Sequence, residues 1–145
     1  MDSTSFPHTA IHAPVLQYTL PGVPSLYYGD EAGMQGYKDP FNRGCYPWGN
    51  ENAELIDFYK ALGKIRRENA VFKKGIFAPI SSMLGCVAFC RYDENESIMV
   101  IVNRNEHPIT YRLPDDFKNA HSIMNSSVEN GEVYIDGCSF TILAK

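Results

Sequence analysis

A long segment rich in glycine, proline and aromatic residues divides this 145-residue chain in two and restricts the folds open to it. The segment runs from Gly29 to Gly49 and reads GDEAGMQGYKDPFNRGCYPWG. Its glycines and prolines exclude regular helix or strand. A loop of this length in a compact domain is usually functional or disordered. Four aromatic residues within it favour an ordered loop: Tyr37, Phe41, Tyr46 and Trp48.

The segments on either side of this loop carry clear periodic signals. Val23–Tyr28 (VPSLYY) is a short apolar and aromatic run, which predicts a buried strand that begins at or just after Pro24. After the loop, apolar residues three and four positions apart predict a helix over Asn52–Glu68. Either Asn50 or Asn52 can cap its N-terminus.

The second half of the chain, residues 70–145, consists of short apolar runs separated by turns. Ile98–Asn103 is the most continuously apolar run, which indicates a central strand. Asp93–Ser97 (DENES) predicts a polar turn before it. Six or seven short strands at this spacing predict an antiparallel β-sandwich. The other expected strands are Cys86–Tyr92, Pro108–Leu113, Ala120–Met124, Glu132–Ile135 and Ser139–Leu143, with weaker ones in Phe72–Ile80.

Composition argues against several classes of partner. The formal charge is −4 without a basic block, so we expect no nucleic acid partner. The apolar runs are too short to span a membrane, and the first residues lack a signal-peptide pattern. Cys86 and Cys90 lie too far apart in one expected strand to be bridged. We therefore expect free thiols and a cytoplasmic, reducing compartment, with a disulfide as the alternative.

Three motifs in the first half resemble the α-amylase family of glycoside hydrolases. YYGDE, DPFNR and YPWG follow one another within Leu20–Gly49. The similarity is greatest to neopullulanases, cyclomaltodextrinases and maltogenic amylases. Further along, AFCRYDENESIMVIVNRNE resembles the C-terminal domain of that family. The resemblance extends from about Val15 to Lys145, and it departs from the family at Gly44–Cys45 and before Val15, where Pro14 would break the expected helix.

The resemblance implies a domain organisation and a parent enzyme. Residues 14–69 correspond to the last strand, loop and helix of a (β/α)8 barrel, and residues 70–145 to a C-terminal β-sandwich. Residues 1–13 form a leader of doubtful origin. The resemblance also implies that the nucleophilic Asp, the acid/base Glu and the stabilising Asp of a retaining α-glucan hydrolase all precede Leu20. We therefore expect no catalytic residue in this chain and no activity from it alone.

The loop after the expected barrel strand supplies the candidate substrate-binding residues. Asp39 and Arg43 could bond sugar hydroxyls, and Tyr37 or Phe41 could stack on a sugar ring. The plainer interpretation of Asp39 and Arg43 is an ion pair that holds the loop shape, and the two interpretations are compatible.

Three further residues are assigned structural roles at the mouth of the barrel. We expect Asp30 and Glu31 to end the strand by bonding backbone N–H groups and an arginine. Trp48 lies beside a proline and before a helix, so we expect it in the core rather than in a ligand platform.

The alternatives differ in their chemistry. His8 and His12 lack a third ligand, and no cysteine cluster has zinc spacing, so we expect no metal and no cofactor. An isolated sandwich could instead bind glucans without cleaving them, which would need exposed, coplanar aromatic side chains. The expected partners are the rest of the parent barrel and its α-glucan substrate. Self-association through the exposed barrel-facing surface is the further expectation.

Overall fold

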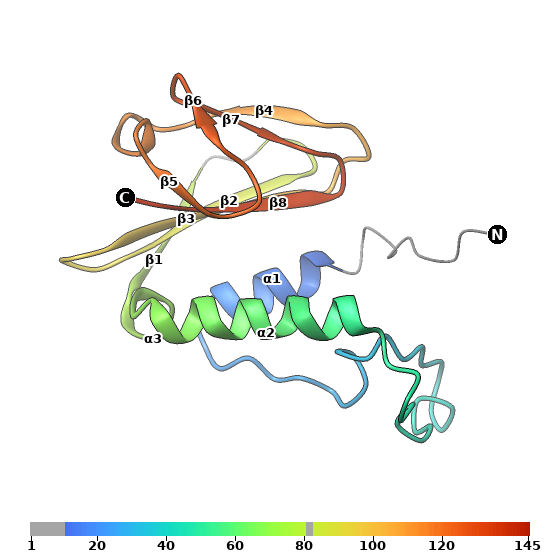
Figure 1. Cartoon of the computed structure of the whole chain (residues 1–145). Helices are drawn as coiled ribbons and strands as arrows, with labels where there is room; N and C mark the ends of the chain where they lie inside the picture. The colour runs from blue at the N-terminus through green and yellow to red at the C-terminus, as the bar shows by residue number, and fades with distance from the viewer. Residues whose placement is uncertain (1–10, 81–82) are drawn as a thin grey trace.

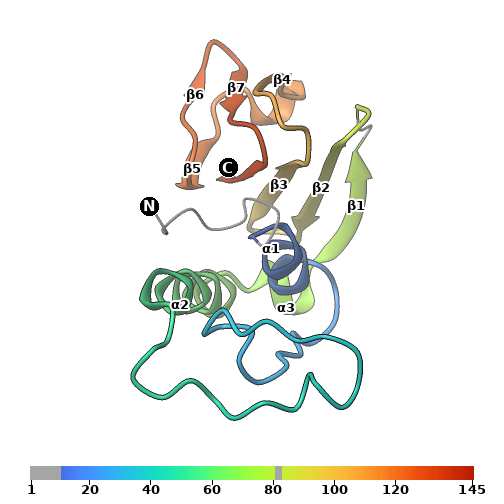
Figure 2. The same ribbon diagram turned by 90° about the vertical axis from the view of Figure 1, so that its right-hand side faces the viewer.

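The chain folds into three layers: a pair of helices, a five-stranded sheet and a three-stranded sheet. The structure is a computed structural model that describes residues 11–80 and 83–145. Figure 1 shows the two helices side by side on one face of the larger sheet, with the smaller sheet on its other face. The loop of residues 23–52 lies beyond the helices, away from both sheets, in Figures 1 and 2.

The sheets form the predicted antiparallel sandwich. All strand pairs are antiparallel. The larger sheet has the order β1-β2-β3-β8-β5 and the smaller one β4-β7-β6. The strands of the larger sheet are β1 (Ile76–Ile80), β2 (Cys86–Tyr92), β3 (Ser97–Asn103), β8 (Ser139–Ala144) and β5 (His121–Met124). Those of the smaller sheet are β4 (Ile109–Arg112), β7 (Glu132–Ile135) and β6 (Val128–Glu129), and a 3-10 turn, η2, spans Asp115–Phe117.

The continuous apolar pattern of β3 reflects burial on both of its faces. β3 lies between β2 and β8, as predicted, and its residues from Ile98 to Asn103 are all buried. Met99 and Ile101 face the interior of the sandwich, whereas Val100 and Val102 face the helices. Alternate side chains of a strand point to opposite faces, so a strand covered on both sides must be apolar throughout.

The helix α2 (Ala53–Glu68) matches its predicted range within one residue. Asn52 is the N-cap, because its side chain accepts a hydrogen bond of 3.0 Å from the backbone N–H of Leu55. Leu62 is buried, and Phe58 and Ile65 pack with it against the larger sheet. The weak strand signal within Phe72–Ile80 corresponds to β1, and a short helix, α3 (Val71–Lys74), precedes it.

The expectation that Pro14 breaks the preceding helix is wrong. The helix α1 spans His12–Thr19 with Pro14 in its first turn. Backbone N–H groups of a first turn have no intrahelical acceptor, so the missing proline N–H costs nothing there. Val15 is fully buried against the sheet. The helix therefore crosses the expected boundary at residues 13 and 14.

The predicted barrel strand Val23–Tyr28 is not a strand in this structure. The segment is irregular, and Val23 is 91% exposed. A parallel barrel strand is held by hydrogen bonds to neighbours on both sides. Among the described residues, none of the strands pairs with Val23–Tyr28, so the apolar pattern has no ladder to join.

No helix in the described part of the chain has the length and apolar character needed to cross a membrane.

Candidate functional site

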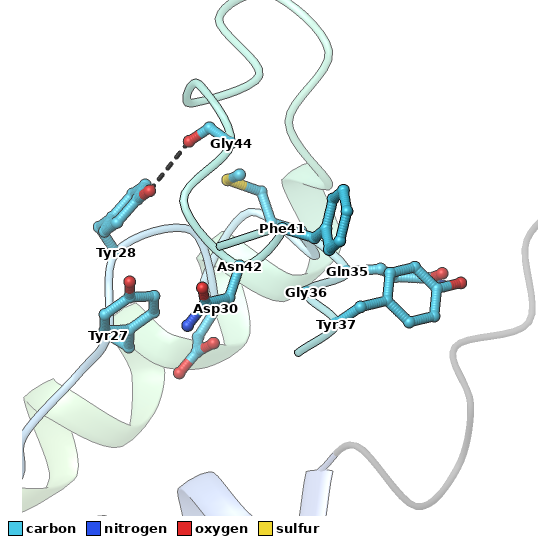
Figure 3. Close-up of a pocket in the computed structure, with 10 residues that line it drawn as sticks. Tyr27, Tyr28, Asp30, Gln35, Gly36, Tyr37, Phe41, Asn42 and Gly44 are labelled. Atoms are coloured by element: carbon cyan, nitrogen blue, oxygen red, sulfur yellow. Dashed lines mark hydrogen bonds between the residues drawn. The ribbon is translucent and has the colours of Figure 1, made fainter. Parts of the chain in front are cut away.

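A cavity of about 310 Å³ lies in the loop between α1 and α2. Figure 3 shows Tyr27 and Tyr28 on one side of it, Tyr37 and Phe41 on the other, and Asp30 and Asn42 between them. Aromatic faces with a few polar groups suit a small polar ligand that has apolar ring faces. The remaining lining residues are Met34, Gln35, Gly36 and Gly44.

A tight turn after Tyr28 gives the cavity its shape. The carbonyl of Gly29 accepts from the N–H groups of Ala32 (3.0 Å) and Met34 (2.9 Å). Gly29 has φ +91, and a Cβ at this position would overlap the Met34 side chain. Only glycine meets both conditions without strain. The turn folds Met34 back beneath Gly29 and aims the chain toward the cavity wall.

Two contacts close the cavity wall. The hydroxyl of Tyr28 donates to the carbonyl of Gly44 over 2.9 Å, which joins the two ends of the loop. The rings of Tyr27 and Tyr28 lie 4.9 Å apart. Loss of solvent around the hydroxyl, together with the neighbouring Tyr27, raises the pKa of Tyr28. The side-chain oxygen of Asn42 is buried without a partner, which leaves an acceptor at the cavity.

The four candidate substrate-binding residues separate into two pairs. Tyr37 and Phe41 line the cavity, and each is 76% exposed. Asp39 and Arg43 do not line it. They form an ion pair with 2.7 Å between Nε and Oδ1, as the plainer interpretation expected. Both side chains are mostly exposed, so this pair fixes local loop shape and adds little stability. A sugar-binding role for all four residues stays a prediction.

Asp30 and Glu31, which were assigned to the mouth of the barrel, make different contacts. Asp30 lines the cavity. The Glu31 carboxylate accepts from the Gly29 N–H over 3.1 Å, which is one of the expected backbone bonds, although the described ion pairs include no arginine partner for it. Glu31 also bonds Tyr46, and this carboxylate contributes to the raised pKa of Tyr46, whose first cause is loss of solvent.

The expectation of a core position for Trp48 is wrong. Its side chain is 80% exposed, and its ring lies 4.6 Å from that of Tyr46, tilted by 50°. A tryptophan is buried only where neighbouring elements enclose it on several sides. The described residues offer this one a single ring neighbour, Tyr46.

Sequence reasoning missed Tyr27, Tyr28, Gln35 and Asn42 as cavity residues. The two tyrosines were assigned to a buried strand because of their apolar setting. Gln35 and Asn42 carry no pattern of their own, and only the folded loop brings them to the cavity. The available signal was the YYGDE motif, which placed the tyrosines beside the loop.

The histidines, cysteines and acids of the described residues form no metal-binding group. No group of three metal-binding side chains exists among residues 11–80 and 83–145. His8 lies outside the described residues. His12 is buried in α1, and burial lowers its pKa. The Asp93 carboxylate accepts from the N–H groups of Asn95 and Glu96, so the DENES segment is the predicted polar turn.

Comparisons with known proteins agree with the motifs. No family model matches the chain. An amylopullulanase from Thermoanaerobacter thermohydrosulfuricus is 54% identical over 63 residues, covering 43% of this chain and 4% of the enzyme. A cyclomaltodextrinase from Thermoanaerobacter pseudethanolicus is 42% identical over 93 residues, covering 63% of this chain and 16% of the enzyme. The chain thus spans a small fraction of these relatives.

Solved structures show the same fold along nearly the whole chain. The ligand-free cyclic α-maltosyl-(1→6)-maltose hydrolase from Arthrobacter globiformis aligns with a TM-score of 0.80 and 25% identity, covering 95% of this chain and 29% of that one. The maltogenic amylase from S. marinus aligns with a TM-score of 0.78 and 29% identity, covering 96% and 19%. In sequence and in fold, the chain therefore matches the C-terminal part of α-amylase-family glycoside hydrolases.

Proposed function

We propose that this chain is part of a retaining hydrolase of α-1,4 glucosidic bonds, with α-1,6 bonds as the alternative. Its loop forms one wall of the substrate site, and its C-terminal sandwich supports the barrel. The observation that carries the proposal is the aromatic cavity built on the YYGDE and DPFNR motifs. Glucose rings have apolar faces that stack on aromatic side chains, and their hydroxyls bond carboxylates and amides. Tyr37, Phe41, Asp30 and Asn42 supply both kinds of group.

The chemistry of cleavage would come from the rest of the parent enzyme. A retaining glycosidase needs two carboxyl groups about 5 Å apart across the bond. Among the described residues, Asp30 is the one carboxylate that lines the cavity, whereas the Glu31 carboxylate accepts from the Gly29 N–H and Asp39 pairs with Arg43. We therefore propose that this chain alone binds glucans weakly and does not hydrolyse them.

Maltoheptaose tests both parts of this proposal. Titration monitored by the fluorescence of Trp48, the single tryptophan, should give saturable binding. The variants Tyr37→Ala and Phe41→Ala should each weaken it by about tenfold, because stacked rings contribute roughly 0.5–1.5 kcal/mol each beyond buried area. Tyr134→Ala, exposed on β7, is the matched control and should leave binding unchanged. Release of reducing sugar by the purified chain would contradict the proposed inactivity.

A glucan-binding role for the sandwich itself has less support. Tyr111, Phe117 and Phe140 are buried in the two cores. Tyr92 and Tyr134 are exposed but lie on different sheets. If the sandwich bound the sugar, Tyr134→Ala would weaken maltoheptaose binding and Phe41→Ala would not.

A further inference from the structure

Two arginines from different elements meet the C-terminal end of α1. Arg66 of α2 donates from Nη1 to the carbonyls of Tyr18 (2.6 Å) and Leu20 (3.5 Å), and from Nη2 to that of Gly22. These carbonyls belong to the last turn of α1 and the residues that leave it. The last carbonyls of a helix have no intrahelical donors and carry the negative end of its dipole, so a guanidinium is well suited to them.

The second arginine reaches the same helix end from the sheet. Arg91 of β2 donates from Nη1 to the carbonyl of Thr19 (2.8 Å) and from Nη2 to that of Gly75 (3.0 Å). Its side chain is 1% exposed, which makes it one of the largest fully buried side chains described. One planar group thus joins α1 to the turn that precedes β1.

A buried cation normally requires an anion beside it. The ion pairs of the described residues include neither Arg66 nor Arg91. Burial, and after it the charge of the neighbouring Arg66, lowers the pKa of Arg91. Backbone carbonyls at the end of α1, together with that of Gly75, take the place of the anion.

The fixed helix end determines where the cavity begins. The side chain of Gln17 on α1 donates to the carbonyl of Ser25, two residues before the cavity residue Tyr27. At the other end of the loop, the N–H of Asn52 donates to the carbonyl of Ala32 over 3.0 Å. Arg66, on α2, therefore contacts the chain just before the cavity wall, while Asn52 contacts it within the turn that follows Tyr28.

We propose that Arg66 and Arg91 form a carbonyl clamp on the end of α1, and that they are positioning residues which transmit the placement of the sandwich to the cavity wall. The ligand part of this inference rests on the proposed function. The clamp gives the sandwich a direct role at the site. A change in β2 moves the start of the cavity loop although β2 does not line the cavity.

Amide hydrogen exchange of the intact chain tests the clamp without any ligand. The N–H of Leu20 donates to the carbonyl of Leu16 over 2.9 Å and reports on the end of α1. In Arg66→Met and Arg91→Met its exchange should rise by at least about tenfold, since hydrogen bonds to charged groups are among the stronger ones. Exchange in β3 and β8 should stay unchanged. Arg67→Met, exposed on the same helix, is the matched control and should behave as wild type.

Arg91→Lys separates geometry from charge. Lysine keeps the charge but cannot bond two carbonyls as a planar fork, so exchange at Leu20 should rise by less than in Arg91→Met and more than in wild type. If Arg91→Met does not fold, the half-exposed Arg66→Met carries the test. Unchanged exchange at Leu20 in Arg66→Met would overturn the clamp. So would a rise of equal size in β3, because that would indicate a general loss of stability.

Maltoheptaose binding by the same variants then tests whether the clamp positions the cavity wall. Arg66→Met should weaken maltoheptaose binding by about threefold or more, with Arg67→Met unchanged. If wild type does not bind maltoheptaose, the proposed function fails while the exchange result still decides the clamp. If exchange at Leu20 rises but binding is unaffected, the clamp does not position the cavity and the inference is overturned in that part.

Discussion

At the residue scale, the four cysteines differ in burial, and none is paired. Cys45 is exposed, Cys138 is partly buried, and Cys86 and Cys90 are buried in β2. Burial raises the pKa of Cys90 to about 11 and also raises that of Cys86. Only the thiolate reacts with a disulfide reagent. Because Cys86 and Cys90 are buried and their pKa values are raised, we expect both thiols to be inert at neutral pH.

Thiol labelling should therefore proceed in distinct phases. With an aromatic disulfide reagent at pH 8, one equivalent should react fast, and Cys45→Ser should remove that phase. Cys86 and Cys90 should react only at the rate of unfolding. Fast labelling of all four thiols in the folded chain would contradict the burial of β2.

The buried Cys90 thiol should make the stability of the fold depend on pH. The folded pKa of Cys90, about 11, lies above its ordinary value of 9.0, so the unfolded chain loses this proton first as pH rises. The contribution of the protonated Cys90 thiol to the free energy of unfolding is fully present below pH 9 and is lost as pH rises toward 11. The free energy of unfolding, measured in urea, should fall across this window in wild type and fall less in Cys90→Ala. An equal fall in both proteins would rule out this thiol as the cause.

At the element scale, Asn52 begins α2 through the hydrogen bond to Leu55. Asn52→Ala should lower the free energy of unfolding by about 1 kcal/mol, the usual effect of losing an N-cap. Asn50→Ala should change it little, since the Asn50 side chain does not cap the helix. Urea denaturation followed by circular dichroism measures both. The reverse order of effects would mean that the helix begins earlier.

The elements that could be predicted from the sequence are those that have a clear periodic pattern and that pack against other elements of this same chain. β2 and β7 match their predicted ranges, and α2 differs by one residue, because each buries its apolar face against other elements of this chain. The Val23–Tyr28 pattern was equally clear but has no described strand beside it. The strand β6 has only two residues, which is too short to show a periodic pattern. Gln35 and Asn42 lie in an irregular loop, so no periodic pattern marks them as cavity residues.

At the scale of the whole molecule, α2 and the larger sheet share one core. Leu62 is 1% exposed within it. Leu62→Ala should lower the free energy of unfolding by about 2–5 kcal/mol, the usual effect of such a truncation. Helix and sandwich should still unfold in one transition, visible by both far-ultraviolet circular dichroism and Cys86 labelling. Lys64→Ala, on the exposed side of the helix, is the control. Two separate transitions would mean that the layers fold independently.

The loop side of the molecule exposes large apolar side chains: Val23, Tyr37, Phe41 and Trp48 are each at least 76% exposed. We propose that the rest of the parent barrel covers Val23 and Trp48, and that the chain alone self-associates through this exposed apolar surface. Light scattering should show a mass that rises with concentration, and Phe41→Ser with Trp48→Ser should reduce that rise. Tyr134→Ser should not. A monomer at all concentrations would contradict this part of the account.

The central claim is that this chain completes a larger α-glucan hydrolase, and the coding DNA upstream of Met1 tests it most directly. The account predicts an open frame that encodes about seven further strand–helix units, with a nucleophilic Asp, an acid/base Glu and an Asn-His-Asp motif. An in-frame stop codon immediately before a functional start site would contradict it, because the cell would then make this chain without the carboxylates that cleave the glycosidic bond.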